Sequence, residues 1–147
     1  MGSLTLPKSG IVYADTQVII YSVQRYPDYS AILEPLWQTL RTGRLKLVTS
    51  QLTVMEALVG PIKHNDEELL AIYDELLSGT EIRLIRISLP ILRLAAKLRA
   101  ETSLRTPDAI HAASALSEHC DTFITNDAAF RRVEGLQVQV LNEVLAG

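Results

Sequence analysis

Short apolar segments alternate with longer amphipathic segments along the chain. The short segments are rich in β-branched residues and predict strands over 10–15, 45–50, 81–88, 121–126 and 136–142. The longer segments repeat apolar residues at helical spacing and predict helices over 16–27, 29–43, 50–60, 65–79, 89–103, 106–116 and 127–133. This alternation favours a parallel sheet with helices on both of its faces.

Residues that start helices define some of these boundaries more closely. Ser50 is the expected cap of the helix over 50–60, and Thr106 and Pro107 are the expected cap and first position of the helix that follows them. Pro35 interrupts an otherwise helical pattern, so it either kinks one helix or starts a second. These positions fix where the helices are expected to begin along the sheet.

Length and composition indicate one globular domain over 1–147, with residues 1–9 expected to be flexible or partly left over from cloning. Hydrophobic residues make up 48% of the 147 residues, which is enough for a sizeable core. The formal net charge of −3 argues against a protein that binds nucleic acid through overall basic charge. Any contact with nucleic acid must therefore use local patches.

The single cysteine, Cys120, excludes an internal disulfide framework and a cysteine-rich zinc site. The amino end lacks a basic region followed by an apolar core, so no targeting signal is expected. No apolar run approaches the roughly 20 residues that span a bilayer. Together these features predict a cytoplasmic protein without a membrane association.

Acidic residues recur where the predicted strands end. Asp15 follows the first strand directly, and Asp127 lies just after the strand over 121–126. Glu56 lies in the helix after the second strand, and Asp108 lies in the first turn of its helix. In open parallel sheets, ligands bind beyond the carboxyl ends of the strands. We therefore expect the four carboxylates to converge in one cleft.

Each acid also has a simpler interpretation. Asp15 and Asp127 could cap the helices that follow them, and Glu56 could be a solvated helix residue, although its neighbours are apolar. Asp108 could serve only the helix dipole, which is worth roughly 0.3–1 kcal/mol. Four such coincidences at one sheet edge are less probable together than one shared site.

Convergence of carboxylates has a chemical consequence. Two carboxylates about 4 Å apart repel by roughly 4 kcal/mol at an effective dielectric near 20, so such a site requires a cation or shifted pKa values. Oxygen ligands suit Mg²⁺ or Mn²⁺ better than Zn²⁺. A hard divalent ion of this kind can activate water and stabilise a leaving oxygen. The pattern therefore points to metal-dependent phosphodiester hydrolysis.

Four motifs resemble those of the PIN-domain ribonucleases, and especially the VapC-type toxins of bacterial toxin–antitoxin pairs. The motifs are "ADTQVII", Ser50-x-x-Thr53-x-x-Glu56, "LRTPDAIHAASAL" and "FITNDAAF". Any one of them is a weak signal, but their order and spacing from Asp15 to Asp127 are specific. The resemblance implies a three-layer α/β/α sandwich with a mostly parallel sheet, and endonuclease action on RNA.

The resemblance also implies roles for the four acids, all as catalytic residues. Asp15 and Asp108 would bind one or two Mg²⁺ or Mn²⁺ ions directly, and Glu56 and Asp127 would complete the site directly or through water. It further implies a homodimer and a cognate antitoxin as partners. A PIN nuclease of RNA processing and a catalytically silent binding module are the alternatives. Phosphoryl transfer by Asp15 is disfavoured, because Gln17 stands where a second Asp would be required.

Several other polar residues are candidates near this site. Gln17 departs from the Asn or Ser found in many relatives, and His111 is either a packed helix residue or a catalytic one. Thr125 and Ser114 could bond near the site or only to local backbone. Three arginines beside the acidic motifs could contact RNA phosphates or be ordinary surface charges: Arg105, Arg131 and Arg132.

Overall fold

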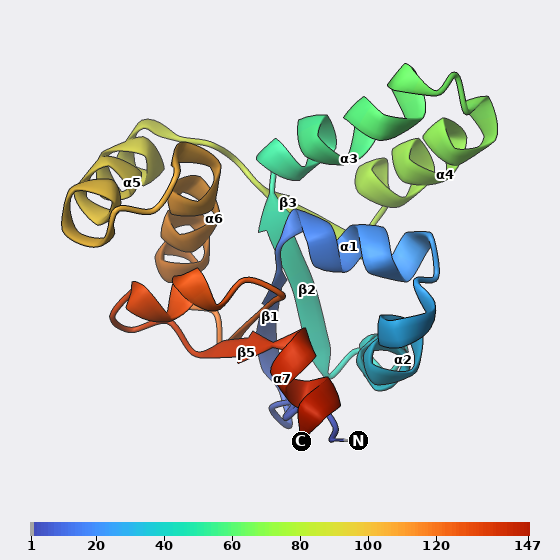
Figure 1. Ribbon diagram of the computed structural model, residues 1–147, viewed down its shortest axis with the longest axis horizontal. Coiled ribbons are helices and arrows are strands. Elements are labelled where there is room, and N and C mark those ends of the chain that lie inside the picture. Colours follow the sequence, from blue (N-terminus) through green and yellow to red (C-terminus); the bar gives the residue numbers. More distant parts are fainter. Residues whose placement is uncertain (1) are drawn as a thin grey trace.

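A five-stranded, all-parallel sheet forms the middle layer of the computed structural model, which describes residues 2–147 (Figure 1). The strand order is β3-β2-β1-β4-β5, with β1 in the centre. The strands are β1 (Gly10–Ala14), β2 (Leu45–Ser50), β3 (Ile82–Ile85), β4 (Thr122–Thr125) and β5 (Val138–Val140). Along the chain, β2 and then β3 are added on one side of β1, whereas β4 and then β5 are added on its other side. The direction in which strands are added therefore reverses between β1 and β4.

Helices cover both faces of this sheet, so the predicted three-layer α/β/α class is confirmed. The helices are α1 (Thr16–Val23), α2 (Pro27–Arg41), α3 (Leu52–Lys63), α4 (Glu67–Ser78), α5 (Leu89–Thr102), α6 (Thr106–Ser117), a 3-10 helix η1 (Ala128–Arg132) and α7 (Leu141–Ala146). Figure 1 shows α5 and α6 on one side of the sheet and α1 to α4 on the other.

Two apolar cores separate the layers, because alternate residues of a strand face opposite sides of a sheet. Val12 and Ala14 of β1 belong to the core beneath α1, α2, α3, α4 and α7. Tyr13, which lies between them, belongs to the core beneath α5, α6 and η1. Four alanines of α6 are buried in this second core: Ala109, Ala112, Ala113 and Ala115. Their small side chains let α6 pack closely on the sheet.

The carboxyl-terminal segment differs from the prediction. A single strand was expected over 136–142, but β5 ends at Val140 and α7 begins at Leu141. Leu141 is fully buried, and Val144 and Leu145 pack against the same core. Their spacing of three and four residues is helical, so packing on the α1/α2 face favours a final helix over a longer strand.

Two helix caps also differ from the prediction. Thr106 is the first residue of α6 and not its cap, and Arg105 occupies the cap position without a side-chain hydrogen bond. Ser50 still belongs to β2, and Gln51 takes the cap position of α3. Ser50 Oγ nevertheless accepts a hydrogen bond from the backbone N–H of Leu52 at 3.1 Å. Ser50 therefore stabilises the start of α3, although it lies one residue before the cap position.

Prolines do not interrupt the helices that contain them. Helix α2 runs without a break through Pro35, and α3 extends beyond the expected end at Gly60, through Pro61, to Lys63. A proline inside a helix removes one backbone hydrogen bond. Leu33 and Leu36 of α2 are buried in the core, and burial of a leucine side chain contributes roughly 1.5–3 kcal/mol to stability.

The segment before β1, for which we expected flexibility, lies against the fold over residues 2–9. Leu4 is buried, and Gly2 donates its N–H to the Val144 carbonyl at 3.0 Å. The Thr5 N–H donates to Gln139 Oε1 at 2.8 Å, and Gln139 Nε2 donates to the Thr5 carbonyl at 2.7 Å. Across residues 2–147, none of the helices has the length and apolar character that crossing a bilayer requires.

Candidate active site

A pocket of about 380 Å³ lies at the carboxyl ends of β1 and β4, where the strand order reverses. Ligand sites in open parallel sheets form at this kind of reversal, because the loops leaving the two strands diverge to opposite faces. The pocket is lined by all four predicted acids: Asp15, Glu56, Asp108 and Asp127. The structure therefore brings together residues that are up to 112 positions apart in the sequence (127 − 15).

Asp15 caps α1 and also faces this pocket. Its Oδ1 accepts the Val18 N–H at 3.1 Å, and its Oδ2 accepts the Thr125 hydroxyl at 2.5 Å. The side chain is almost entirely buried. Burial raises the pKa of Asp15, against the lowering effect of the Thr125 hydrogen bond, and the nearby charge of Asp108 raises it further. The capping role is thus real, but it leaves the ionised carboxylate in an unfavourable site.

Glu56 extends from α3 into the pocket and is held through one oxygen. Thr16 donates its hydroxyl to Glu56 Oε1 at 2.7 Å, and His111 Nε2 lies 2.8 Å from the same atom. Burial opposes ionisation, but the hydrogen bonds from His111 and Thr16 outweigh it, so the pKa of Glu56 is lowered. Glu56 is therefore not a solvated surface residue, as its simpler interpretation would require.

Asp108 and Asp127 complete the acidic lining from α6 and from the start of η1. Asp108 lies in the first turn of α6, and Arg105 Nε is 3.8 Å from its Oδ2. Burial raises the pKa of Asp108, and the charge of Asp127 raises it further. Asp127 caps η1 by accepting the Ala129 N–H at 2.9 Å. Both acids therefore help to start a helix and also add negative charge to the pocket.

The chemistry of these donors fits a hard divalent cation. All four donors are carboxylates. Burial raises the pKa values of Asp15 and Asp108, and the charges of neighbouring carboxylates raise them further, which a cation would relieve. Within residues 2–147, no three Asp, Glu, His or Cys side chains are already gathered into a metal-binding cluster. The carboxylates thus share one pocket without forming a closed cage.

Three polar residues of the pocket were missed from the sequence. Thr16 and Tyr21 of α1 line it together with Asn126, which follows β4. Asn126 Nδ2 donates to the hydroxyls of Tyr29 at 2.9 Å and Tyr21 at 3.2 Å, while its Oδ1 accepts the Asn142 N–H at 2.9 Å. The signals that could have found Thr16 and Asn126 were their positions next to Asp15 and Asp127.

The other candidate residues lie in different surroundings. Gln17 lines the pocket and is exposed, whereas Ser114 donates only to the Ile110 carbonyl of its own helix at 2.7 Å. The Arg105 side chain is 86% exposed beside Asp108. Arg131 pairs with Glu143 of α7, and Arg132 is exposed. Of the three arginines, Arg105 is thus the one in contact with a pocket residue.

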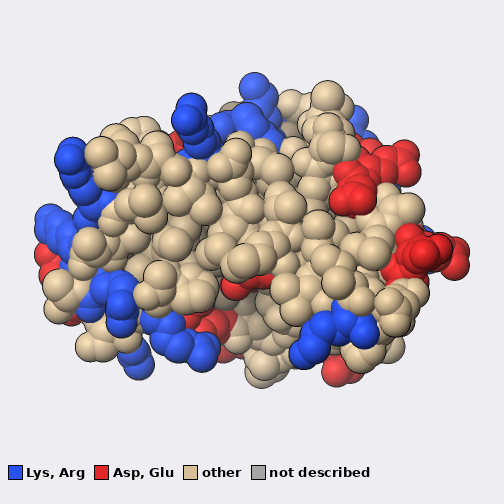
Figure 2. All heavy atoms as spheres, turned by 90° about the horizontal axis from the view of Figure 1, so that it is seen from above, with Lys and Arg blue, Asp and Glu red and all other residues tan. Residues whose placement is uncertain are grey.

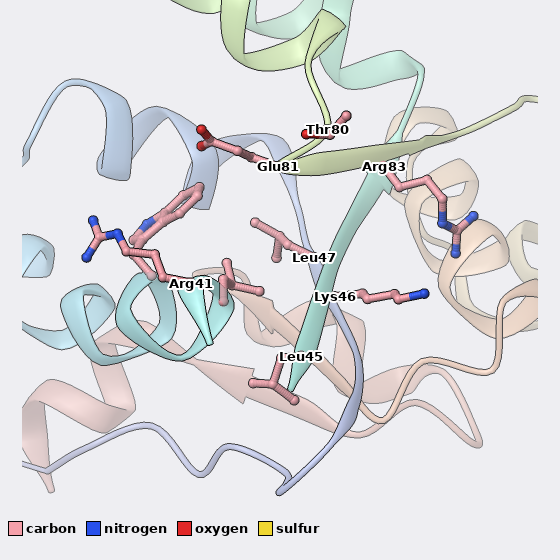
Figure 3. Close-up of a pocket in the computed structure, with 9 residues that line it drawn as sticks. Arg41, Leu45, Lys46, Leu47, Thr80, Glu81 and Arg83 are labelled. Carbon is pink, nitrogen blue, oxygen red and sulfur yellow. The ribbon is translucent and has the colours of Figure 1, made fainter. Parts of the chain in front are cut away.

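A second pocket, of about 470 Å³, lies near the start of β2 and β3 and the end of α2 (Figure 3). Figure 3 shows Leu45 and Leu47 of β2 directed toward α2, while Lys46 and Arg83 point the other way. Glu81 is the one acidic residue in its lining. This pocket lies toward the amino ends of the strands and contains none of the predicted site residues.

The carboxyl ends of the strands face the viewer in Figure 2, which shows a broad central area of uncharged residues with Lys, Arg, Asp and Glu around its rim. Helices α3 and α5, at this end of the molecule, carry large exposed apolar side chains, namely Met55, Val59, Ile62, Leu89 and Leu92. The Met55 side chain, next to Glu56, is 61% exposed. Apolar surface of this kind beside a charged pocket is typical of a site that also binds a macromolecular partner.

Comparisons with known proteins agree with this architecture. A family model described as PIN domain matches residues 12–136 of the chain. A chain of the VapBC2 complex from Rickettsia felis, bound to a promoter DNA fragment, is 23% identical with a TM-score of 0.70, over 88% of this chain and 98% of that one. A chain of a toxin–antitoxin complex from Klebsiella pneumoniae is 24% identical with a TM-score of 0.66, over 88% and 97% of the two chains.

A further structure, VapBC-1 from nontypeable Haemophilus influenzae, contains a chain that is 22% identical with a TM-score of 0.67, over 90% of this chain and 98% of that one. At these levels of identity, the solved structures establish a shared fold. No curated protein sequence is significantly similar to this chain. The family match begins within β1, at residue 12, and extends beyond β4, so it includes all four acids of the pocket.

Proposed function

Because this chain belongs to the PIN-domain family, we propose that it is a metal-dependent endoribonuclease that hydrolyses phosphodiester bonds of RNA. The observation that carries the proposal is the pocket in which Asp15, Glu56, Asp108 and Asp127 meet at the reversal of strand order. Four carboxylates in one pocket are costly for the fold unless a cation shares the site. This cost is the reason for assigning them a role in chemistry.

Asp15 and Asp108 are the proposed direct ligands of one or two Mg²⁺ or Mn²⁺ ions, and Glu56 and Asp127 complete the site directly or through water. The raised pKa values of Asp15 and Asp108 support this assignment, because their ionised forms lack sufficient compensation from the protein itself. When bound, a divalent ion of this type supplies activation of water and stabilisation of the leaving oxygen.

The chain's own residues position the reacting groups. Glu56 has a lowered pKa and is ionised at neutral pH, so its carboxylate can accept a hydrogen bond from water or the proton that water releases. Thr125 holds Asp15 in place through its 2.5 Å hydrogen bond. Arg105 is exposed beside Asp108 and is the first candidate to contact an RNA phosphate, with Arg131 and Arg132 as further candidates.

An RNA cleavage assay with end mapping tests this proposal. We expect the purified chain to cleave RNA internally in Mg²⁺ or Mn²⁺, to lose cleavage in excess chelator, and to regain it when the metal is restored. The reason is that the pocket offers four negative charges and, among its lining residues, no arginine or lysine to neutralise a phosphate. Cleavage that persists undiminished in chelator would contradict the metal requirement.

The proposed biological role is that of the toxin in a toxin–antitoxin pair. The solved structures described as VapBC or toxin–antitoxin complexes support it, since chains in them share this fold over most of their length. We further propose a homodimer, supported by exposed apolar residues on α3 and α4 that the core does not use: Met55, Val59, Ile62 and Ile72. Helix α3 adjoins the pocket through Glu56, and the exposed apolar residues of α3 and α4 offer surface to an antitoxin.

The antitoxin is expected to inhibit the chain by placing an Arg or Lys among the pocket carboxylates. Charge-assisted hydrogen bonds would hold this basic side chain, while an apolar segment of the antitoxin packs on the helices. Co-purification with the product of a neighbouring small gene should therefore suppress cleavage. Changing the basic residue to Ala should restore cleavage while the complex persists.

The matched control for this experiment is an Ala substitution at a basic residue of the antitoxin outside the bound segment, which should leave inhibition intact. If the bound partner leaves both cleavage and metal affinity unchanged, the toxin–antitoxin role is wrong. The nuclease proposal would survive that result, because it depends on the pocket and not on the partner.

A further inference from the structure

His111 lies at the back of the acidic pocket, where it connects the sheet to Glu56. It belongs to α6, one turn after Asp108, and only 3% of its surface is exposed. Its Nδ1 is 2.6 Å from the Tyr13 hydroxyl of β1. On the opposite side of the ring, Nε2 is 2.8 Å from Glu56 Oε1, with the Thr16 hydroxyl 3.3 Å away as a second neighbour. Both ring nitrogens therefore have partners.

The surroundings of Tyr13 determine which ring nitrogen carries the hydrogen. The Tyr13 oxygen accepts the backbone N–H of Ser50 at 3.1 Å. Burial raises the pKa of Tyr13 well above its usual value, so the hydroxyl keeps its proton. That proton is donated to His111 Nδ1, the acceptor within 2.6 Å. The hydrogen of a neutral His111 ring is then on Nε2, from which it is donated to Glu56.

A second series of hydrogen bonds reaches the same oxygen of Glu56 from the threonines. Thr16 donates to Glu56 Oε1 at 2.7 Å, so the 3.0 Å bond between Thr53 and Thr16 has Thr53 as its donor. By the same reasoning, Thr49 donates to Thr53 across 2.8 Å. Among residues 2–147, no hydrogen bond reaches the other oxygen, Oε2.

We propose that Tyr13 and His111 are positioning residues that, together with Thr16, hold Glu56 by Oε1 and leave Oε2 free to act in the pocket. The inference rests on the proposed function in one respect, namely that Oε2 takes part in metal binding or catalysis. Glutamate has a flexible side chain, and two donors on one oxygen restrict it to a single orientation. Partners of this kind typically change metal affinity or activity by about 10-fold to 100-fold when they are removed.

The first test is the tautomer of His111 in the chelated wild-type chain, measured by long-range ¹H–¹⁵N NMR. The signals are assigned by comparison with His111→Gln, because the chain has two other histidines, His64 and His119. We expect the Nε2–H tautomer in the wild type and also in Tyr13→Phe, because Nε2 must carry the hydrogen to donate to the ionised Glu56 carboxylate. A wild-type ring that carries its hydrogen on Nδ1 would overturn the proposal, regardless of whether the chain cleaves RNA.

The second test measures Mn²⁺ affinity by calorimetry in His111→Leu, His111→Gln and Thr16→Val, alongside kcat and KM for RNA. We expect His111→Leu to bind Mn²⁺ about 10-fold to 100-fold more weakly and to lose kcat more than KM. His111→Gln should recover part of this loss, because its amide can donate to Glu56. If His111→Leu does not fold, Thr16→Val tests the same restraint from the other series.

Ser114→Ala is the matched control, because Ser114 is buried in the same helix and bonds only to its own backbone. It should leave Mn²⁺ affinity unchanged. Equal losses in His111→Leu and His111→Gln, or unchanged affinity in His111→Leu and Thr16→Val, would overturn the positioning proposal alone. A wild-type chain that neither binds Mn²⁺ nor cleaves RNA would instead overturn the proposed function and, with it, the use of Oε2.

Discussion

Replacing Asp108 with Asn is expected to abolish RNA cleavage while the chain remains folded. The change removes one negative charge from the pocket at almost constant volume, and the Asn side chain can still start α6. We expect the rate to fall by more than about 100-fold, beyond the loss that follows removal of an outer hydrogen-bond partner. Asp15→Asn should have a similar effect, because Asp15 is the other proposed direct ligand. Single-turnover cleavage in saturating Mg²⁺ measures both.

Asp28→Asn is the matched control for the Asp108 prediction. Asp28 also lies in the first turn of a helix, α2, but it is exposed and does not line the pocket. If Asp108 acted only on the helix dipole, the two substitutions would have comparable and small effects. Cleavage by Asp108→Asn at the wild-type rate would show that the assignment of this carboxylate is wrong.

Asp15→Asn is also expected to stabilise the metal-free chain, increasingly so as the pH rises. Burial raises the pKa of Asp15 in the folded state above its value in the unfolded chain. The contribution of protonated Asp15 to the stability of the fold is therefore fully present when the pH is below the pKa of Asp15 in the unfolded chain, which is about 3.9. This contribution is lost as the pH rises through the raised pKa of Asp15 in the folded chain. Asn does not titrate, so the variant does not lose stability in this way. Each unit of difference between the folded and unfolded pKa values corresponds to about 1.4 kcal/mol in the free energy of unfolding.

Thermal unfolding in chelator between pH 4 and pH 8 measures this effect. The Tm of Asp15→Asn minus that of wild type should grow with pH, by roughly 2–4 °C for each kcal/mol. Added Mn²⁺ should stabilise wild type more than the variant, because a ligand stabilises the state that binds it. Asp66→Asn is the control, since Asp66 caps α4 by accepting the Leu69 N–H at an exposed position. A difference that stays constant across this range would contradict the prediction.

The layered fold and the position of the acids could be predicted from local patterns. Alternating strands and helices require parallel strands, and the carboxyl ends of parallel strands lie at one edge of the sheet. Asp15 and Asp127 follow two such strands, so their approach to each other depends only on the topology. Sequence reasoning was wrong where local and long-range preferences conflict. Leu141 extends an apparent strand, but packing against α2 makes it helical.

The sequence by itself thus determined the parallel architecture, the acidic edge of the sheet and the family resemblance. Only the tertiary structure decided how the acids are held. Tyr13 and His111 are 98 positions apart, and His111 and Glu56 are 55 positions apart, yet they form one hydrogen-bonded series. Hydrogen bonds require donor and acceptor within about 3 Å and in alignment. That alignment depends on how α3 and α6 pack on β1, and no local pattern of hydrophobic and polar residues specifies it.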